Sequence, residues 1–153
     1  MIPRYTPADF AALWSSEHRY RIWFDVELAA CRAMETHGVV PKGVADAVLP
    51  FRDKLVVTRI DEIEQTTKHD VIAFLTHVEE RLGDEARFLH YGLTSSDVLD
   101  TAFAIQLRDA ADLIINGIDR SLLPALREKA LLLAEVPVIG RTHGIYAEPV
   151  TCG

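Results

Sequence analysis

The chain has 153 residues, 49% of them hydrophobic and 25% charged, and its 23 acidic and 16 basic residues give a net charge of -7. This composition is that of an ordinary globular protein and excludes a disordered or fibrous chain. Because the basic residues are scattered, a nucleic-acid-binding surface is not expected. Any anion site must therefore be built locally from a few groups.

The cysteine and hydropathy patterns indicate a reducing compartment. Cys31 and Cys152 are far apart and form no CxxC pair, so neither a disulfide framework nor a thiolate metal site is expected. The N-terminus lacks a charged leader followed by an apolar run, and no segment approaches roughly 18 uninterrupted apolar residues. We therefore expect a soluble, cytoplasmic protein without membrane contact.

Short helices are predicted up to residue 93. The tract Thr6-Pro7-Ala8-Asp9 is typical of a helix start, and this helix should end near Trp14. Ser15 or Ser16 should cap a second helix, in which apolar residues recur every three or four positions until Gly38. Further short helices are predicted from Pro41 to Pro50, from Thr58 through Glu64, and from Val71 to Leu82 with Asp70 as N-cap and Gly83 as the stop.

From residue 94 the pattern changes to one long helical stretch that has no clear stop before Glu135. Thr94 with Asp97 three positions later, or Ser95 or Ser96, is expected to cap it. An apolar stripe follows this stretch for roughly forty residues, on the order of 60 Å at helical rise. Its members are Val98, Ala102, Ile105, Leu107, Ala111, Ile114, Ile118, Leu122, Leu126, Ala130 and Leu133.

A small domain cannot bury so long a stripe, so the helix is expected to pack in a bundle between subunits. Pro124 predicts a kink and Gly117 a weak point, which leaves two shorter helices open as an alternative. After Val136 the chain is expected to turn through a loop that carries His143, with no bundle partners following. We expect the chain to be the front part of a larger protein.

Three polar tracts at expected helix ends each carry a histidine. They are Thr67-Lys68-His69-Asp70, His90 to Asp97, and Gly140-Arg141-Thr142-His143-Gly144. Such tracts gather backbone N–H groups, hydroxyls and a group that titrates near neutral pH, which suits a multiply anionic substrate. The plainer alternative is that the first two are ordinary helix caps and the third is a loop with a satisfied histidine. Flanking glycines favour a ligand-binding role for the third tract.

Metal binding is not expected, because His69, Asp70, His77 and His90 show no HExxH or similar spacing. His18, His37 and His77 are assigned to the surface or the core. No cofactor is predicted.

Taken together, the tracts resemble the adenylosuccinate lyase family of the fumarase and aspartase superfamily. The resemblance rests on four blocks in order, which span the chain essentially end to end. They are Arg4-Tyr5, Thr67-x-His69-Asp70-Val71-x-Ala73-Phe74, Gly92-Leu93-Thr94-Ser95-x-Asp97-Val98-x-Asp100-Thr101-Ala102, and Gly140-Arg141-Thr142-His143-Gly144-x-x-Ala147-Glu148-Pro149-x-Thr151-x-Gly153.

The resemblance implies β-elimination of fumarate from adenylosuccinate, giving AMP, and from the succinylcarboxamide ribotide of purine biosynthesis. By similarity, His143 is the acid that protonates the leaving amine, and His69 assists it. Arg4 and Tyr5 would hold the phosphate and ribose end of the nucleotide, with His90 a weaker candidate there. Lys68, His69 and Asp70 would line the same pocket, and Thr94, Ser95 and Thr142 would bind the succinyl part.

The sequence departs from the family pattern in two ways. Lys68 stands where many relatives carry Arg, which keeps the charge and loses the bidentate fork. The catalytic base of the family is a serine on a downstream glycine- and serine-rich loop, and its active site draws on several subunits of a homotetramer. We therefore expect an inactive N-terminal fragment. The alternatives are another fumarate-releasing lyase and a helical association module without chemistry.

The predicted fold is all-α. A small N-terminal helical domain should span residues 1–93. Residues 94–153 should form the start of the central helical bundle, truncated after its first long helix.

Overall fold

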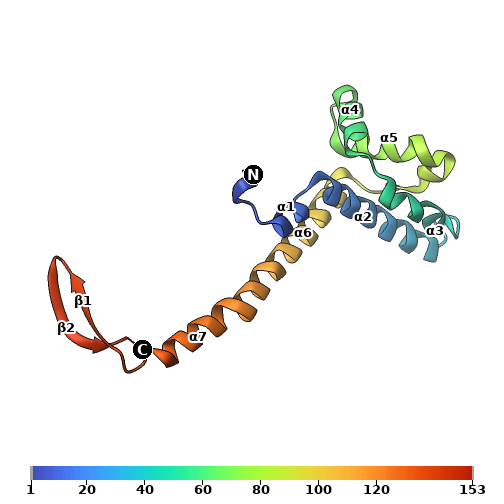
Figure 1. The fold of residues 1–153 in the computed structure, drawn as a ribbon. Helices are drawn as coiled ribbons and strands as arrows, with labels where there is room; N and C mark the ends of the chain where they lie inside the picture. Colours follow the sequence, from blue (N-terminus) through green and yellow to red (C-terminus); the bar gives the residue numbers. More distant parts are fainter. Residues whose placement is uncertain (1, 153) are drawn as a thin grey trace. The chain divides into compact units, whose positions relative to one another are not determined.

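Helices dominate the computed structural model, which describes residues 2–152 (Figure 1). The chain divides into two compact units, residues 1–110 and 111–153, and each is described by itself. The first unit contains the 3-10 turn η1 (Pro3–Tyr5), α1 (Ala8–Leu13), α2 (Ser16–Thr36), α3 (Val44–Val48), η2 (Leu49–Lys54), α4 (Val57–Thr67), α5 (Asp70–Leu82), η3 (Gly83–Phe88) and the start of α6 (Ser95–Gly117). The second contains the end of α6, the π-helical turn η4 (Ile118–Leu122), α7 (Leu123–Leu132), β1 (Pro137–Thr142) and β2 (Ile145–Thr151).

Side-chain caps of the first unit agree with the sequence prediction at α2 and differ at α1 and α5. The N-cap of α1 is Pro7, with no capping bond from a side chain. The Ser15 hydroxyl accepts a hydrogen bond from the His18 N–H at 3.1 Å, which confirms the cap of α2. The predicted cap of α5 is wrong by one position, because Asp70 is already the first helical residue. The N-cap is His69, whose ring Nδ1 accepts from the Ile72 N–H at 3.4 Å.

Three aromatic rings from α2 and α5 form the centre of the first unit. Tyr20 stacks on Phe74 with ring centroids 5.9 Å apart and planes 9° apart, and Trp23 meets both rings edge-on. All three are buried. Since aromatic pairs in these geometries stabilise beyond the area they bury, this cluster anchors the two helices to each other.

The start of α6 belongs to the same core. Val98 and Ala102 are buried, and the Gln106 side-chain amide donates to the Leu13 carbonyl at 3.1 Å. The boundary between the two units therefore lies within α6, between residues 110 and 111. The domain boundary expected between residues 93 and 94 stays a prediction.

The long helical stretch ends at Leu132, ahead of the predicted Glu135. Gly117 keeps helical torsion angles, with φ -64° and ψ -41°. The π-helical turn η4 follows, and Pro124 lies in the first turn of α7. A proline has no N–H to donate, and a π-helical turn shifts the hydrogen-bonding pattern just ahead of it. Of the two alternatives, a kinked helix or two shorter helices, the structure shows the second, with α6 and α7 joined by η4.

The segment after Val136 differs from prediction. The expected loop around His143 is an antiparallel hairpin of β1 and β2, so the all-α class is confirmed and only the loop is replaced by a small two-stranded sheet. The pairs shift in register between Ile139 and Arg141, where β2 contributes one more residue than β1. The strands contain several β-branched residues, which favour extended backbone over helix.

Candidate active site

The first two predicted tracts meet in the first unit, through His69. The His69 Nε2 lies 3.3 Å from the Ser95 Oγ, although the two residues are 26 positions apart. Because Nδ1 accepts the capping bond from Ile72, the neutral ring carries its proton on Nε2 and donates it to the Ser95 hydroxyl. The side chain of His69 remains 44% exposed, so a ligand can still reach the ring.

The local backbone explains why His69 stands at this junction. Lys68 closes α4 in the left-handed conformation, with φ 53° and ψ 29°, and its N–H donates to the Glu64 carbonyl. The chain then extends through His69 before α5 begins. Asp70 lies beside the ring, with its Oδ1 3.5 Å from the His69 Nδ1, and this oxygen accepts from the Val71 N–H at 2.8 Å.

Thr94 and Asp97, the predicted capping pair, bond to each other at the start of α6. The Asp97 carboxylate accepts from both the N–H and the hydroxyl of Thr94, at 2.7 and 2.9 Å, and the Asp97 N–H returns a bond to the Thr94 carbonyl. These two bonds from Thr94 lower the pKa of Asp97. Ser95 is not part of this pair, and its side chain contacts His69, so the N-terminal ends of α5 and α6 lie close together.

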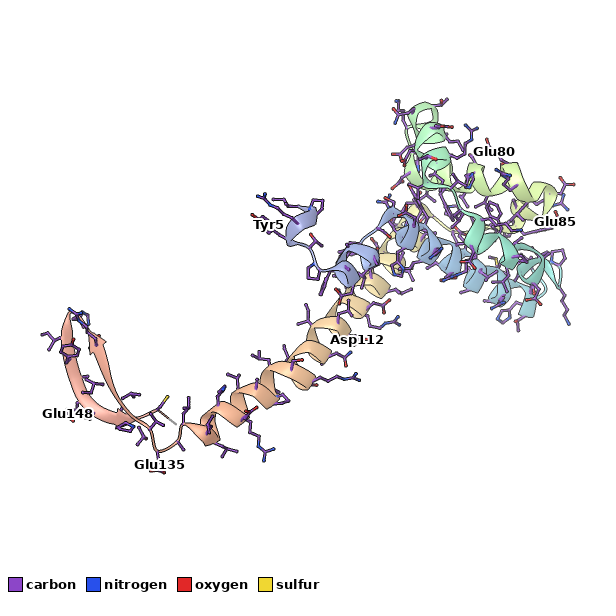
Figure 2. All side chains as sticks on the ribbon, in the orientation of Figure 1. Tyr5, Glu80, Glu85, Asp112, Glu135 and Glu148 are labelled. Carbon is purple, nitrogen blue, oxygen red and sulfur yellow. The ribbon has the colours of Figure 1, made fainter. Side chains whose placement is uncertain are left out.

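Arg4 and Tyr5 lie in η1 near the N-terminus, where Figure 2 labels Tyr5. Both are exposed, and the Arg4 guanidinium lies over the Tyr5 ring, 4.7 Å from its centroid. Within residues 2–152 their side chains make no hydrogen bond or ion pair with the His69 tract. The first unit therefore joins the second and third predicted blocks and leaves the first apart.

Thr142 and His143 belong to the second unit. Thr142 pairs with Ile145, so His143 and Gly144 alone form the hairpin turn. Both central residues have positive φ, 51° at His143 and 78° at Gly144, the combination that matches the twist of two antiparallel strands. His143 is thus presented at the tip of a hairpin, exposed.

One buried charged residue was not singled out from the sequence. Glu27 on α2 is buried and bonds to His90 through both carboxylate oxygens. A signal was available, because Glu27 follows Tyr20 by seven positions and Phe24 by three, which places it on the buried face of α2. A carboxylate on such a face needs a partner, and the sequence does not reveal that the partner is 63 positions away.

One cavity of the first unit lies away from these tracts. Its volume is about 550 Å³, and it is lined by Ala47, Pro50, Phe51, Lys54, Arg81 and Leu82. Among residues 2–152 no group of three or more His, Cys, Asp or Glu side chains could hold a metal ion. No described helix is both long and apolar enough to cross a membrane.

Comparison with known proteins places the chain in a family. Residues 5–153 match the model of the Lyase family. The whole chain is 43% identical to adenylosuccinate lyase from Synechocystis sp., and 41% identical to those from Aquifex aeolicus and Bacillus subtilis. The chain spans about a third of the length of these relatives, 35% in each case.

Solved structures agree with this assignment. Fumarate lyase from Mesorhizobium sp. superposes with a TM-score of 0.82 at 27% identity, over 92% of this chain and 33% of its own. The 3-carboxy-cis,cis-muconate lactonizing enzyme from Pseudomonas putida gives 0.83 at 29% identity, over 95% of this chain and 34% of its own.

Proposed function

The chain belongs to the Lyase family, and from this we propose that it forms part of an adenylosuccinate lyase, corresponding to the N-terminal third of the enzyme. The observation that carries the proposal is the 41–43% identity to three adenylosuccinate lyases over the entire chain. The proposed reaction releases fumarate from adenylosuccinate, giving AMP, and from the succinylcarboxamide ribotide of purine biosynthesis.

The reaction needs a base, an acid and an anion cradle. The base removes a proton from the carbon beside a carboxylate, the carbon–nitrogen bond breaks, and the acid protonates the departing nitrogen. Negative charge grows on the carboxylate as the proton leaves, so hydrogen-bond donors must already point at it. We place the acid and part of the cradle on this chain, and the base on sequence outside it.

His143 is the proposed acid. Its place at the tip of a two-residue turn supports this role, because the ring is exposed and Gly144 beside it allows close approach of a ligand. Thr142, one position earlier, is proposed to bind the succinyl part of the substrate.

His69 is the proposed assistant to the acid. The capping bond at its Nδ1 and the Ser95 hydroxyl at its Nε2 hold the ring in one orientation and one neutral tautomer. A substrate oxygen that takes the place of the Ser95 hydroxyl would accept a hydrogen bond from the His69 Nε2–H, which is already oriented toward that position. Thr94 and Ser95 are accordingly proposed to bind the succinyl carboxylates at the start of α6.

The nucleotide end is proposed to bind Arg4, Tyr5, Lys68 and Asp70. Arg4 and Lys68 supply positive charge for a phosphate, and both are exposed. Lys68 acts as a point charge rather than a bidentate fork, so its contact should depend less on geometry than that of an arginine would.

The complete enzyme is proposed to be a cytoplasmic homotetramer, in which the apolar stripe of α6 and α7 packs in a helical bundle. The exposure of stripe residues such as Ile114 and Leu122, 53% and 52%, supports this, because side chains of this kind are usually buried by a neighbour.

The test is turnover of adenylosuccinate, followed by the absorbance change that accompanies fumarate release. The full-length protein should turn it over, whereas the 153-residue chain alone should not, even at high protein concentration. Turnover by the short chain would contradict the placement of the base outside it. A full-length protein that cleaves aspartate but not adenylosuccinate would instead identify a sibling lyase, and one inactive on both would favour an association module.

A further inference from the structure

Glu27 is the most deeply buried carboxylate in the described part of the chain. It lies on α2 among the core side chains and is 1% exposed. Burial raises the pKa of Glu27, and the hydrogen bonds from His90 oppose that rise. A group of this kind destabilises a fold unless its oxygens find donors, so its contacts indicate why it is there.

Both oxygens of Glu27 bind one residue, His90. Oε2 accepts from the His90 backbone N–H at 2.6 Å, and Oε1 lies 2.6 Å from the ring Nδ1. His90 adopts the left-handed conformation with φ 59°, which is uncommon for a residue with a side chain. The pair of bonds to one carboxylate offsets the strain of this backbone.

The arrangement fixes the chemistry of the His90 ring. Because Nδ1 faces a carboxylate, it carries a proton and donates it, which leaves Nε2 as the nitrogen open to a ligand. Nε2 has no hydrogen-bond partner among residues 2–152, and the His90 side chain is 18% exposed. The His90 carbonyl also accepts from the Leu93 N–H at 3.2 Å, so the backbone of His90 is anchored shortly before Thr94.

We propose that Glu27 is a positioning residue, which holds His90 through Nδ1 and its backbone so that Nε2 is presented to an anionic group of the substrate beside the start of α6. The ligand part of this inference rests on the proposed lyase function. The positioning part rests on the contacts alone. Glu27 itself lies in the core and touches no substrate, and it acts only through His90.

The first experiment determines the tautomer of the His90 ring. Nitrogen-15 spectra of the 153-residue chain at alkaline pH report which nitrogen of His90 bears the proton. We expect Nδ1 to be protonated in the unaltered chain. In Glu27→Gln the amide has one acceptor oxygen in place of two, so either one bond to His90 is lost or the amide NH₂ faces Nδ1 and moves the proton to Nε2.

A ring whose proton is on Nε2 in the unaltered chain would overturn the positioning role, and this result needs no variant to fold. An identical His90 spectrum in the unaltered chain and in folded Glu27→Gln would overturn it as well.

The second experiment measures kinetics in the full-length protein. Glu27→Gln should lower kcat/KM roughly 10–100-fold, by analogy with the loss caused by removing the hydrogen-bond partner of a metal-ligating histidine. The loss should lie mainly in KM, since a group that binds a non-reacting part of the substrate contributes to the ground state and the transition state alike.

The matched control is Glu35→Gln, the same substitution on the same helix. Glu35 bonds to the Ala45 N–H at 2.7 Å and makes no contact with His90, so this variant should keep normal kinetics. In Glu27→Gln/His90→Ala the loss should equal that of His90→Ala alone, because Glu27 acts through His90. Additive losses, or equal effects of the two glutamine variants, would overturn the proposal.

A failure of the proposed function and a failure of the positioning role give different results. If the unaltered full-length protein does not cleave adenylosuccinate, the proposed function is wrong, while the spectra still decide whether Glu27 positions the ring. If turnover is normal and Nδ1 of His90 is unprotonated, the function stands and the positioning role is wrong.

Discussion

The two units of this chain differ in how many of their side chains are buried. Residues 1–110 bury their aromatic and branched side chains in one core, centred on Tyr20, Trp23 and Phe74. Within residues 111–152 no side chain is buried, although the segment is largely regular helix and hairpin. Secondary structure in the second unit therefore draws little stabilisation from its own packing, whereas most helical stability in proteins comes from tertiary contacts.

The two units also differ in how firmly their histidine side chains are held. His69 is held by a capping bond and by Ser95, and His90 by a buried carboxylate, so the first unit supplies histidines of fixed orientation. His143 is placed only by the torsion angles of a two-residue turn. If the two units differ in solution as they do in packing, substitutions in the first unit and in the second should have unequal effects.

The largest expected effect is on stability of the first unit. Phe74→Ala should destabilise the 153-residue chain by about 3–5 kcal/mol, because it removes a fully buried ring between Tyr20 and Trp23. Lys129→Ala in the second unit should change stability by less than about 0.5 kcal/mol, since that side chain is exposed and lies outside the apolar stripe. Urea unfolding followed by tryptophan fluorescence and circular dichroism measures both, and similar losses for the two variants would remove the contrast.

The next effect concerns catalysis by the second unit. In the full-length protein His143→Ala should lower turnover by about two orders of magnitude or more, the usual contribution of a positioned acid or base. Its melting temperature should stay unchanged, because the side chain lies exposed at a turn. Near-normal turnover would reassign the acid, with His69 the first residue to examine.

A smaller effect is expected on association. The 153-residue chain should form oligomers in light scattering, because burying each large aliphatic side chain contributes roughly 1.5–3 kcal/mol and the stripe has no cover within its own unit. Ile114→Glu should shift the distribution toward monomer, whereas Ser121→Glu, also exposed on the same stretch, serves as the control. A monomer with rapid amide exchange across residues 111–135 would show that the stripe finds no partner.

The smallest effect is a pH dependence confined to the first unit. Burial lowers the pKa of His77; Glu80 opposes the shift, and Arg81 and Arg59 add to it. The unfolded chain binds a proton at the ordinary imidazole pKa, so the contribution of His77 to stability is complete above that value and is lost as the pH falls toward the lowered pKa of the folded state. Thermal unfolding between about pH 7 and pH 5 should show this loss.

The matched variant for this test is His77→Gln, which can still accept the hydrogen bond that His77 Nε2 receives from the Val56 N–H. It should lose less stability over the same pH range than the unaltered chain. His37→Asn, at an exposed histidine, should behave like the unaltered chain. Equal pH dependence in all three would show that His77 is not the group responsible.

Local signals predicted most of the helical body. The hydroxyl of Ser15, the glycine that follows α2 and the Thr94–Asp97 pair act over three or four residues, so their meaning is contained in the tract itself. The hairpin was missed because its turn residues, His143 and Gly144, were interpreted as a ligand loop. The available signal was a dipeptide ending in glycine between two tracts with β-branched residues. The structure adds that both turn residues have positive φ.

The sequence by itself determined the helical class, the Ser15 cap, the family and the three histidine tracts, because each depends on residues close together in the chain. Only the tertiary structure decided that His69 meets Ser95, that the buried Glu27 holds His90, and that the apolar stripe is covered over its first turns and exposed beyond residue 110. The physical reason is that side-chain partners and burial depend on how elements pack, and packing brings together residues whose separation along the chain carries no pattern.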